Sequence, residues 1–197
     1  MSYELDPLSD NCYPDTFVLI NKLDIREADT LAEAETLATF INSSRLELEP
    51  LQGNFDFEHY KAVHKFLFDE LYEWAGQIRN VNISKKGTRF CPHDEIEKRA
   101  KFIFERMWQR DLFRGLNKSE FVTEIVDFYC VTNELHPFRE GNGRAQRSFL
   151  TQLIRNAGYD INFSDIDVDF LMIATIQSAN GVTDLLQEIF EEAIRIV

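Results

Sequence analysis

Most of this chain carries apolar residues at the spacing of an α-helix, and this repeat constrains its fold more than any other feature. Residues three and four apart predict a helix over about 27–47, on Leu31, Ala34, Leu37, Ala38 and Ile41. The same spacing predicts further helices over 57–71, 92–107, 118–135, 144–156, 168–177 and 184–196. We therefore expect a mostly all-α protein, a helical bundle.

Polar residues and glycine mark the ends of several of these helices. Asp56 and Asn117 have side chains that accept hydrogen bonds from the unpaired N–H groups of a helix start, and Glu120 completes a capping pair with Asn117. Pro92 suits the first turn of the third helix. Gly158 follows the fifth helical pattern and is expected to end it.

Residues 77–90 do not follow the helical repeat. Their sequence is QIRNVNISKKGTRF, in which Ile78, Val81 and Ile83 favour strands and Lys86-Gly87 favours a turn. We expect a β-hairpin inserted among the helices. On the residues alone, a surface hairpin without a further task remains an alternative.

Length and composition indicate a single folded unit. The chain has 197 residues, of which 44% are apolar and 17 are phenylalanine, so we expect one core rich in aromatic rings. No repeat, low-complexity tract or Gly/Ser-rich linker divides it. We predict one domain over 1–197, with a core at about 50–160, the N-terminal helix at about 27–47 and the C-terminal helices at about 165–196.

Net charge and cysteine content narrow the possible partners and compartments. The net charge is −13 and the sequence pI is about 4.7, so neither direct nucleic-acid binding nor membrane binding is expected. Cys12, Cys91 and Cys130 are few and far apart, as expected for reduced thiols. We find no signal peptide and no apolar run of membrane-spanning length, and therefore expect a cytoplasmic protein.

The segment HPFREGNGRAQR, from His136 to Arg147, has the composition of an anion-binding loop. Pro137 disfavours helix at the residue before it, so the preceding helix should stop at His136. Gly141 and Gly143 permit close approach of a ligand to the backbone, and the helix that follows adds unpaired N–H groups. Such a loop at a helix N-terminus suits a phosphate group.

Two arginines strengthen this interpretation. Arg144 and Arg147 are three residues apart and share one face of the first helical turn. A cation at a helix N-terminus is unfavourable by about 0.3–1 kcal/mol, and a bound polyphosphate would reverse the sign of that effect. Residues 131–150 also carry a local net charge of +1 in an acidic chain.

The same segment offers groups for chemistry on a phosphate. Glu140 beside phosphates suits Mg²⁺, and His136 is the nearby group whose pKa suits a general base. The segment contains no serine or cysteine nucleophile, so direct in-line transfer is the simpler mechanism. Taken singly, a helix-ending histidine, a glycine turn and solvated arginines are ordinary structural features, but their combination within one short segment favours a site.

These residues resemble the motif of the Fic family, HxFx[D/E]GNGRxxR, and every specified position is present. The segments 53–56, 71–76 and 121–135 also look like the Fic core. From about residue 15 onward the chain is similar to the toxin components of Fic toxin–antitoxin pairs. The resemblance implies a helical Fic fold with an inserted β-hairpin flap. It also implies a protein adenylyltransferase, which moves AMP from ATP to a hydroxyl of a target protein.

The resemblance implies catalytic and structural roles in the first half of the motif. His136 would deprotonate the target hydroxyl. Glu140 would bind Mg²⁺ on the α- and β-phosphates of ATP. Phe138 would anchor the loop in the core, and Pro137 would shape its start.

The second half of the motif would bind the nucleotide phosphates. Asn142 and the backbones of Gly141 and Gly143 would hold phosphate oxygens. Arg144 and Arg147 would hold the distal phosphates, with Arg147 chiefly on the γ-phosphate. The related Doc branch, which phosphorylates its target, has a lysine in place of Gly143, so the glycine favours AMP transfer.

The hairpin would be the family's flap, which aligns a target segment by strand addition. Lys85, Lys86, Thr88 and Phe90 lie in or beside its turn and are its candidate target-binding residues. The resemblance suggests bacterial type II topoisomerase subunits as targets. Transfer of UMP, phosphate or phosphocholine, and a catalytically silent module that binds through the flap, remain alternatives.

Fic proteins are commonly inhibited by a helix bearing [S/T]xxxE[G/N], whose glutamate pairs with the second motif arginine. The nearest match here is Ser43–Glu47, but Leu48 stands where glycine or asparagine is expected. The alternative is that these residues form a solvated helix end. We expect that a small antitoxin protein supplies the inhibitory helix, and the Ser43–Glu47 segment remains the internal alternative.

Overall fold

The computed structural model describes residues 4–5, 11–85 and 88–197, most of which are helical. The helices are α1 (Ala28–Leu48), α2 (Phe57–Phe68), α3 (Ile96–Gln109), α4 (Lys118–Leu135), α5 (Asn142–Asn156), α6 (Val168–Ser178) and α7 (Asp184–Ala193). Short 3₁₀ turns lie at His93–Glu95, Asp111–Phe113 and Phe163–Asp165. No helix in these described ranges has both the length and the apolar character needed to cross a membrane.

The predicted helix starts are confirmed where a capping side chain marks them. The Asp56 side chain accepts a hydrogen bond from the N–H of His59 at 2.8 Å. Asn117 and Glu120 form a reciprocal capping box at the start of α4. Pro92 leads into the 3₁₀ turn that precedes α3, so regular helix begins slightly later than predicted.

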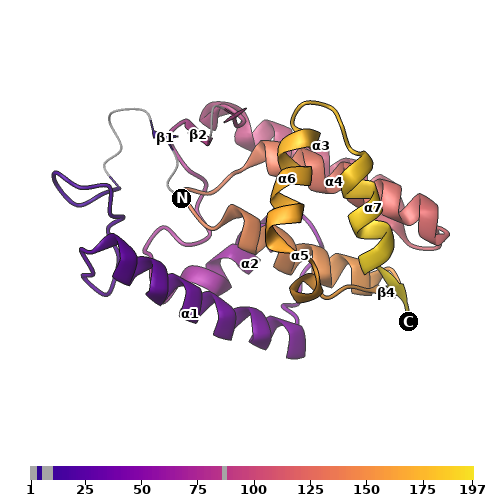
Figure 1. The fold of residues 1–197 in the computed structure, drawn as a ribbon, viewed down its shortest axis with the longest axis horizontal. Helices are drawn as coiled ribbons and strands as arrows, with labels where there is room; N and C mark the ends of the chain where they lie inside the picture. Colours follow the sequence, from indigo (N-terminus) through magenta and orange to yellow (C-terminus); the bar gives the residue numbers. More distant parts are fainter. Residues whose placement is uncertain (1–3, 6–10, 86–87) are drawn as a thin grey trace.

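Helix α5, which begins at the glycine-rich loop, is a central packing element of the fold. It packs against α1, α2 and α4, while α7 packs against α4 and α6. Figure 1 shows α1 along one edge of the molecule, with α6 and α7 away from it and α5 between. The N-terminus of α5 therefore lies in the interior, where several helices can direct side chains toward it.

The core is aromatic, as the phenylalanine content predicts. Tyr60 packs against Phe138 and Phe149, with ring centroids 5.5 and 5.2 Å apart. Phe104 contacts Phe149 and Phe128 in edge-to-face geometry. Phe138 and Phe149 are completely buried, so the motif loop and α5 are joined to one aromatic cluster.

The hairpin is present but shorter than predicted. Strand β2 (Ile83–Lys85) pairs antiparallel with β3 (Thr88–Arg89), and β1 (Glu4–Leu5), which the sequence does not predict, pairs with the other edge of β2. Ile78 and Val81 lie outside the strands. The reason is that the backbone N–H of Arg79 donates to the Pro137 carbonyl at 2.9 Å, which holds this segment against the motif loop.

The predicted end of the last helix is wrong. Helix α7 ends at Ala193, and Arg195–Ile196 form a strand, β5, that pairs antiparallel with β4 (Tyr159–Asp160). Ile194 has an extended backbone, with ψ of 129°, and its side chain is buried. Burial of that side chain and pairing with β4 outweigh continuation of the helix at this point, and such tertiary contacts are invisible to helical spacing.

Candidate active site

The motif loop begins where α4 ends. His136 caps α4 in a left-handed conformation, with φ of 42° and ψ of 59°, so the chain turns sharply there. The Arg79 guanidinium donates to the His136 carbonyl at 2.8 Å, and it also donates to the carbonyls of Val81 and Cys91. A buried arginine from the hairpin side therefore pairs the carbonyl of the α4 cap residue and joins it to two carbonyls of the hairpin segment.

Asn142 holds the two ends of the loop together. Its side-chain oxygen accepts the N–H of Phe138 at 2.8 Å, and its side-chain nitrogen donates to the Phe138 carbonyl at 2.8 Å. The residue is only 3% exposed. We predict a phosphate-binding role for Asn142, and in this structure its side chain instead shapes the loop. Its backbone N–H, in the first turn of α5, is the group that can reach an anion.

His64 on α2 supports the loop through a hydrogen bond to its backbone. The sequence patterns do not single out this residue. The N–H of Gly76 donates to its Nδ1 at 2.9 Å, so Nε2 carries the proton and donates to the Glu140 carbonyl at 3.0 Å. Its ring stacks on Phe138, with centroids 3.9 Å apart. Burial lowers the pKa of His64 to about 4, which keeps it neutral in this structural role.

Gly141 is required by the loop geometry. Its φ is +77°, and a Cβ at this position would lie 2.2 Å from the ring of Phe68. Gly143 differs, because its φ is ordinary and a Cβ there would meet only the tip of Arg147, at 3.3 Å. The first glycine is therefore needed for the fold of the loop, whereas Gly143 keeps the lining of the adjoining cavity open.

His136 has the geometry of a neutral base. Its Nδ1 lies 2.9 Å from the Asn133 carbonyl, so Nδ1 donates and the basic nitrogen of the neutral ring is Nε2. Phe90 stacks on the ring, with centroids 3.7 Å apart and an interplanar angle of 13°. Burial, helped by the charges of Lys85 and Arg79, lowers the pKa of His136 to about 3, although the hydrogen bond to Asn133 opposes the shift. The imidazole is therefore unprotonated at neutral pH.

Glu140 lies just before the N-terminus of α5. One carboxylate oxygen accepts the Gly141 N–H at 2.8 Å and lies 3.6 Å from the Arg144 guanidinium. Burial raises the pKa of Glu140, and the charge of Glu35 raises it further. No group of three or more His, Cys, Asp or Glu side chains in the described ranges forms a ready metal site. A cation at Glu140 would need ligand phosphates to complete its coordination, which is typical of Mg²⁺.

The two motif arginines have different surroundings. Arg144 donates to a carboxylate oxygen of Glu35 at 2.7 Å and lies over the ring of Phe68, 4.7 Å from its centroid. In the described part of the chain, Arg147 forms no ion pair with a carboxylate. Burial lowers the pKa of Arg147, and the charge of Arg144 lowers it further. An anion that brings negative charge to Arg147 would relieve both effects.

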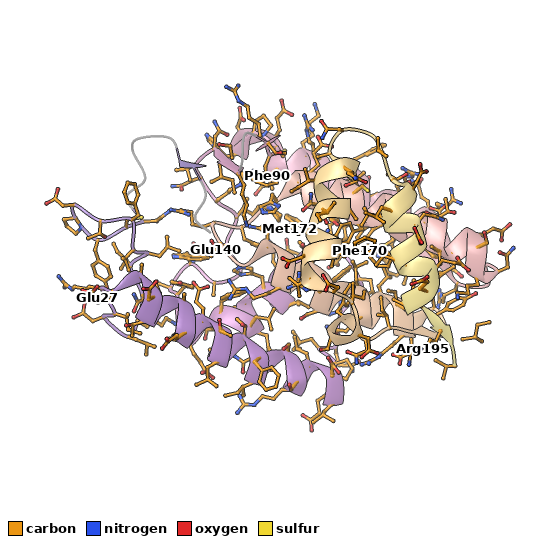
Figure 2. All side chains as sticks on the ribbon, in the orientation of Figure 1. Glu27, Phe90, Glu140, Phe170, Met172 and Arg195 are labelled. Carbon is orange, nitrogen blue, oxygen red and sulfur yellow. The ribbon has the colours of Figure 1, made fainter. Side chains whose placement is uncertain are left out.

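A cavity of about 610 Å³ lies beside most of these groups, although Glu140 is not among its lining residues. Part of its lining comes from the motif residues His136, Gly143, Arg144 and Arg147. Another part is apolar and includes Leu171, Met172 and Ile176 of α6. Figure 2 labels Phe90 and Met172, which line the cavity from the hairpin and from α6. The cavity therefore offers cations for phosphates and an apolar surface for a flat ring.

The hairpin contributes to this cavity through three of the four predicted target-binding residues, Lys85, Thr88 and Phe90. Lys86 lies outside the described residues. From α1, Ser43 and Glu47 also line the cavity, but no ion pair joins Glu47 to Arg147 among the described residues. The internal inhibitory contact considered from the sequence is therefore not formed in this structure.

Like His64, Glu35 and Arg79 bond to motif residues and were not predicted from the sequence patterns. For Glu35 a signal was present: it occupies the buried stripe of α1 that also contains Leu31, Asn42 and Leu46. A carboxylate on such a stripe needs a buried partner. For Arg79, which lies in an irregular segment, no periodicity could indicate the partner.

The fold and the site together define a class: a helical protein with an anion-binding loop at a helix N-terminus, two cationic side chains and a neutral base. The chain belongs to the Fic/DOC family, whose model matches residues 54–154. The predicted family and fold are thereby confirmed.

Relatives in two bacteria are similar over most of this chain. The protein adenylyltransferase VbhT of Bartonella schoenbuchensis is 38% identical over 181 residues, which cover 92% of this chain and 37% of VbhT. The probable protein adenylyltransferase Fic of Salmonella typhimurium is 36% identical over 182 residues, which cover 92% of this chain and 90% of that protein. This chain thus spans well under half of the length of VbhT.

Solved structures show the same fold with nucleotides bound. BepC of Bartonella tribocorum, with bound AMPPNP, has a TM-score of 0.90 and 27% identity, covering 95% of this chain and 97% of BepC. The N-terminal Fic domain of a putative cell filamentation protein from Bartonella quintana, with bound ADP, has a TM-score of 0.89 and 27% identity, covering 94% of both chains.

Proposed function

We propose that this chain is a protein adenylyltransferase that transfers AMP from ATP to a side-chain hydroxyl of a target protein. The observation that carries the proposal is the neutral, buried His136 lining a cavity that also presents Arg144 and Arg147. A base and two phosphate-binding cations on one cavity are the groups that in-line attack on a phosphate requires. The names of the relatives and the nucleotides bound in similar structures support the same reaction.

In the proposed reaction His136 Nε2 takes the proton of the target hydroxyl as its oxygen attacks the α-phosphorus of ATP. The new P–O bond forms on the target, the bond to the β-phosphate breaks, and pyrophosphate leaves. A pKa of about 3 is low for a base. The negative charge of bound ATP offsets the fields of Lys85 and Arg79, which raises the proton affinity of the imidazole in the complex.

We propose that Mg²⁺ accompanies ATP and is held by Glu140. The chemistry of the site fits this ion, because one part-buried carboxylate lies in the motif loop and the phosphates would supply the remaining oxygens. When bound, the ion neutralises charge on the phosphates. The protein orients the carboxylate through the Gly141 N–H and keeps Arg144 close to it.

A target segment is proposed to add as a strand to the hairpin. In the described residues the strand order is β1-β2-β3, so β2 is paired on both edges and β3 has one edge without a strand neighbour. Thr88 lies on β3 and also lines the cavity. A strand added at β3 would therefore carry its hydroxyl toward His136.

We also propose that the protein acts as a toxin in the cytoplasm and is restrained by a small antitoxin. The absence of an ion pair between Glu47 and Arg147 among the described residues favours an inhibitory helix supplied by another chain. Type II topoisomerase subunits are the proposed targets, by analogy with similar toxins. Co-expression with a candidate antitoxin tests the first proposal through growth, and mass spectrometry of modified lysate proteins tests the second.

The test of the proposed reaction is incubation of the purified chain with bacterial lysate and with ATP, GTP or UTP labelled at the α-phosphate. Transfer of label from ATP, and its loss in His136→Ala, is expected. Label from UTP instead of ATP would indicate a UMP transferase. Label on no protein from any nucleotide would favour phosphate or phosphocholine transfer, or a binding module, and would overturn the proposal.

A further inference from the structure

Glu35, on α1, is joined to the motif although it lies outside the residues that match the family model. One of its carboxylate oxygens accepts a hydrogen bond from Arg144 at 2.7 Å. The other accepts one from the hydroxyl of Tyr72. The side chain of Glu35 is only 12% exposed, so this is a largely buried, charge-assisted contact between distant segments.

Tyr72 holds the carboxylate in one orientation. The residue is completely buried, and burial, followed by the charge of Glu35, raises the pKa of its hydroxyl above the ordinary value. The hydroxyl is therefore a permanent donor. Each carboxylate oxygen of Glu35 accepts a hydrogen bond, one from Tyr72 and one from Arg144, and together these bonds fix the orientation of the carboxylate plane.

Arg144 is held in place by two contacts of its guanidinium. The guanidinium lies over the ring of Phe68, and its Nη2 atom donates to Glu35. Arg144 itself lines the cavity. A guanidinium has several N–H groups, so those that Glu35 does not engage can be directed at an anion in the cavity.

Glu35 also competes with Glu140 for the same guanidinium. Nη2 of Arg144 lies 2.7 Å from Glu35 and 3.6 Å from Glu140, so Glu35 has the closer contact. Arg144 and Glu140 are four residues apart in sequence, with Glu140 just before the start of α5, and their charged groups are already close enough to pair directly. Without Glu35, Arg144 would be expected to move onto Glu140, away from the phosphates and onto the carboxylate proposed to bind Mg²⁺.

We propose that Glu35 is a positioning residue that orients Arg144 toward the β- and γ-phosphates of the nucleotide and keeps Glu140 available. This inference rests on the proposed function, because it assumes that the cavity binds a nucleoside triphosphate. It assigns to α1 a part in binding the donor. Repulsion between Glu35 and the phosphates opposes this effect, and the positive charge of Arg144, 2.7 Å from Glu35, offsets it.

The test compares Glu35→Ala, Glu35→Gln and Tyr72→Phe with Glu33→Ala, which changes an exposed glutamate on the same helix. Calorimetry would measure the affinity of each for a non-hydrolysable ATP analogue and for AMP, with thermal denaturation as a control. Glu35→Ala is expected to weaken the triphosphate about tenfold and AMP by less than about twofold. Glu35→Gln, which can still accept from Arg144, should keep most of the affinity, and Glu33→Ala should match wild type.

Three results would overturn the inference. Unchanged triphosphate affinity in Glu35→Ala would show that Arg144 does not need Glu35 to orient it. Tighter binding would show that Glu35 competes with phosphate. Equal losses for the triphosphate and AMP would indicate a purely structural role. In each case wild type that still transfers AMP leaves the proposed function standing, whereas wild type that binds no triphosphate overturns both.

Discussion

The motif loop, residues 136–147, and the hairpin, residues 83–89, border one cavity but are built in different ways. Backbone groups of the loop form hydrogen bonds with the buried side chains of His64, Arg79 and Asn142. The hairpin consists of very short strands whose described residues are mostly part-exposed. The loop is thus preorganised, whereas β3 of the hairpin has one edge without a strand neighbour among the described residues.

The difference matches two physical tasks. Stabilising charge on a phosphate requires groups that need no reorganisation during the reaction, and buried hydrogen bonds provide that rigidity. Binding a protein segment by strand addition requires an accessible edge, which a packed element cannot offer. Changes in the loop should therefore affect catalysis or folding strongly, and changes in the hairpin should chiefly affect target affinity.

The largest expected effect is that of His136→Ala. Transfer of AMP should fall by at least about a thousandfold, because no other group can take the hydroxyl proton. ATP affinity should stay within about threefold, since His136 acts on the hydroxyl and not on the nucleotide. Labelled-AMP transfer and calorimetry measure the two quantities. Transfer near the wild-type rate would remove His136 as the base and with it the contrast between loop and hairpin.

Glu140→Gln should lower transfer by roughly two orders of magnitude at fixed Mg²⁺. The amide keeps the shape of the side chain but loses the charge that would hold the ion. A titration of the initial rate with Mg²⁺ should show a higher requirement in the variant than in wild type. An identical Mg²⁺ dependence in both proteins would argue against Glu140 as the ligand.

The two glycines of the loop offer a matched pair. Gly141→Ala should destabilise the fold by about 3 kcal/mol, because its Cβ would overlap Phe68 and its φ is positive. Gly143→Ala should cost less than about 1 kcal/mol, because only the flexible tip of Arg147 is near. Urea denaturation measures both. Equal losses of stability would show that the loop is less closely packed than its contacts indicate.

Lys85→Ala tests the role of the hairpin and should also change the pH dependence of transfer. The charge of Lys85 lowers the pKa of His136, so its removal lets that pKa rise. Because the base must be unprotonated, the acid limb of kcat/KM should move to higher pH. The KM for the target should rise by no more than about tenfold, with ATP affinity unchanged. Lys101→Ala, on the surface of α3, is the control and should alter neither property.

The smallest expected effect is that of Glu47→Gly. Glu47 is exposed and forms no ion pair with Arg147 in the described residues, so the initial transfer rate at saturating ATP should not change. Stability should fall by about 1 kcal/mol, the usual cost of glycine within a helix. A rise in rate of about tenfold or more would show an internal inhibitory contact and would sink the proposal of inhibition by another chain.

Local sequence was sufficient for much of this fold. The helical spacing and the capping residues Asp56 and Asn117 predict the helices because those signals act within a few residues. The hairpin was also predicted, but the strands β1, β4 and β5 were not. Arg195–Ile196 pair with Tyr159–Asp160, and Glu4–Leu5 pair with the hairpin, through contacts between segments far apart in the chain.

The same division holds at the candidate site. By itself the sequence determined the type of loop and its candidate groups, a histidine, a carboxylate and two arginines, because all of them lie within twelve consecutive residues, His136–Arg147. Only the tertiary structure decided how those groups are held. The side chain of Asn142 hydrogen-bonds to Phe138 within the loop, and Glu35 on α1 accepts a hydrogen bond from Arg144. Such pairings depend on the packing of whole helices, and short-range spacing carries no information about which distant side chain that packing brings into contact.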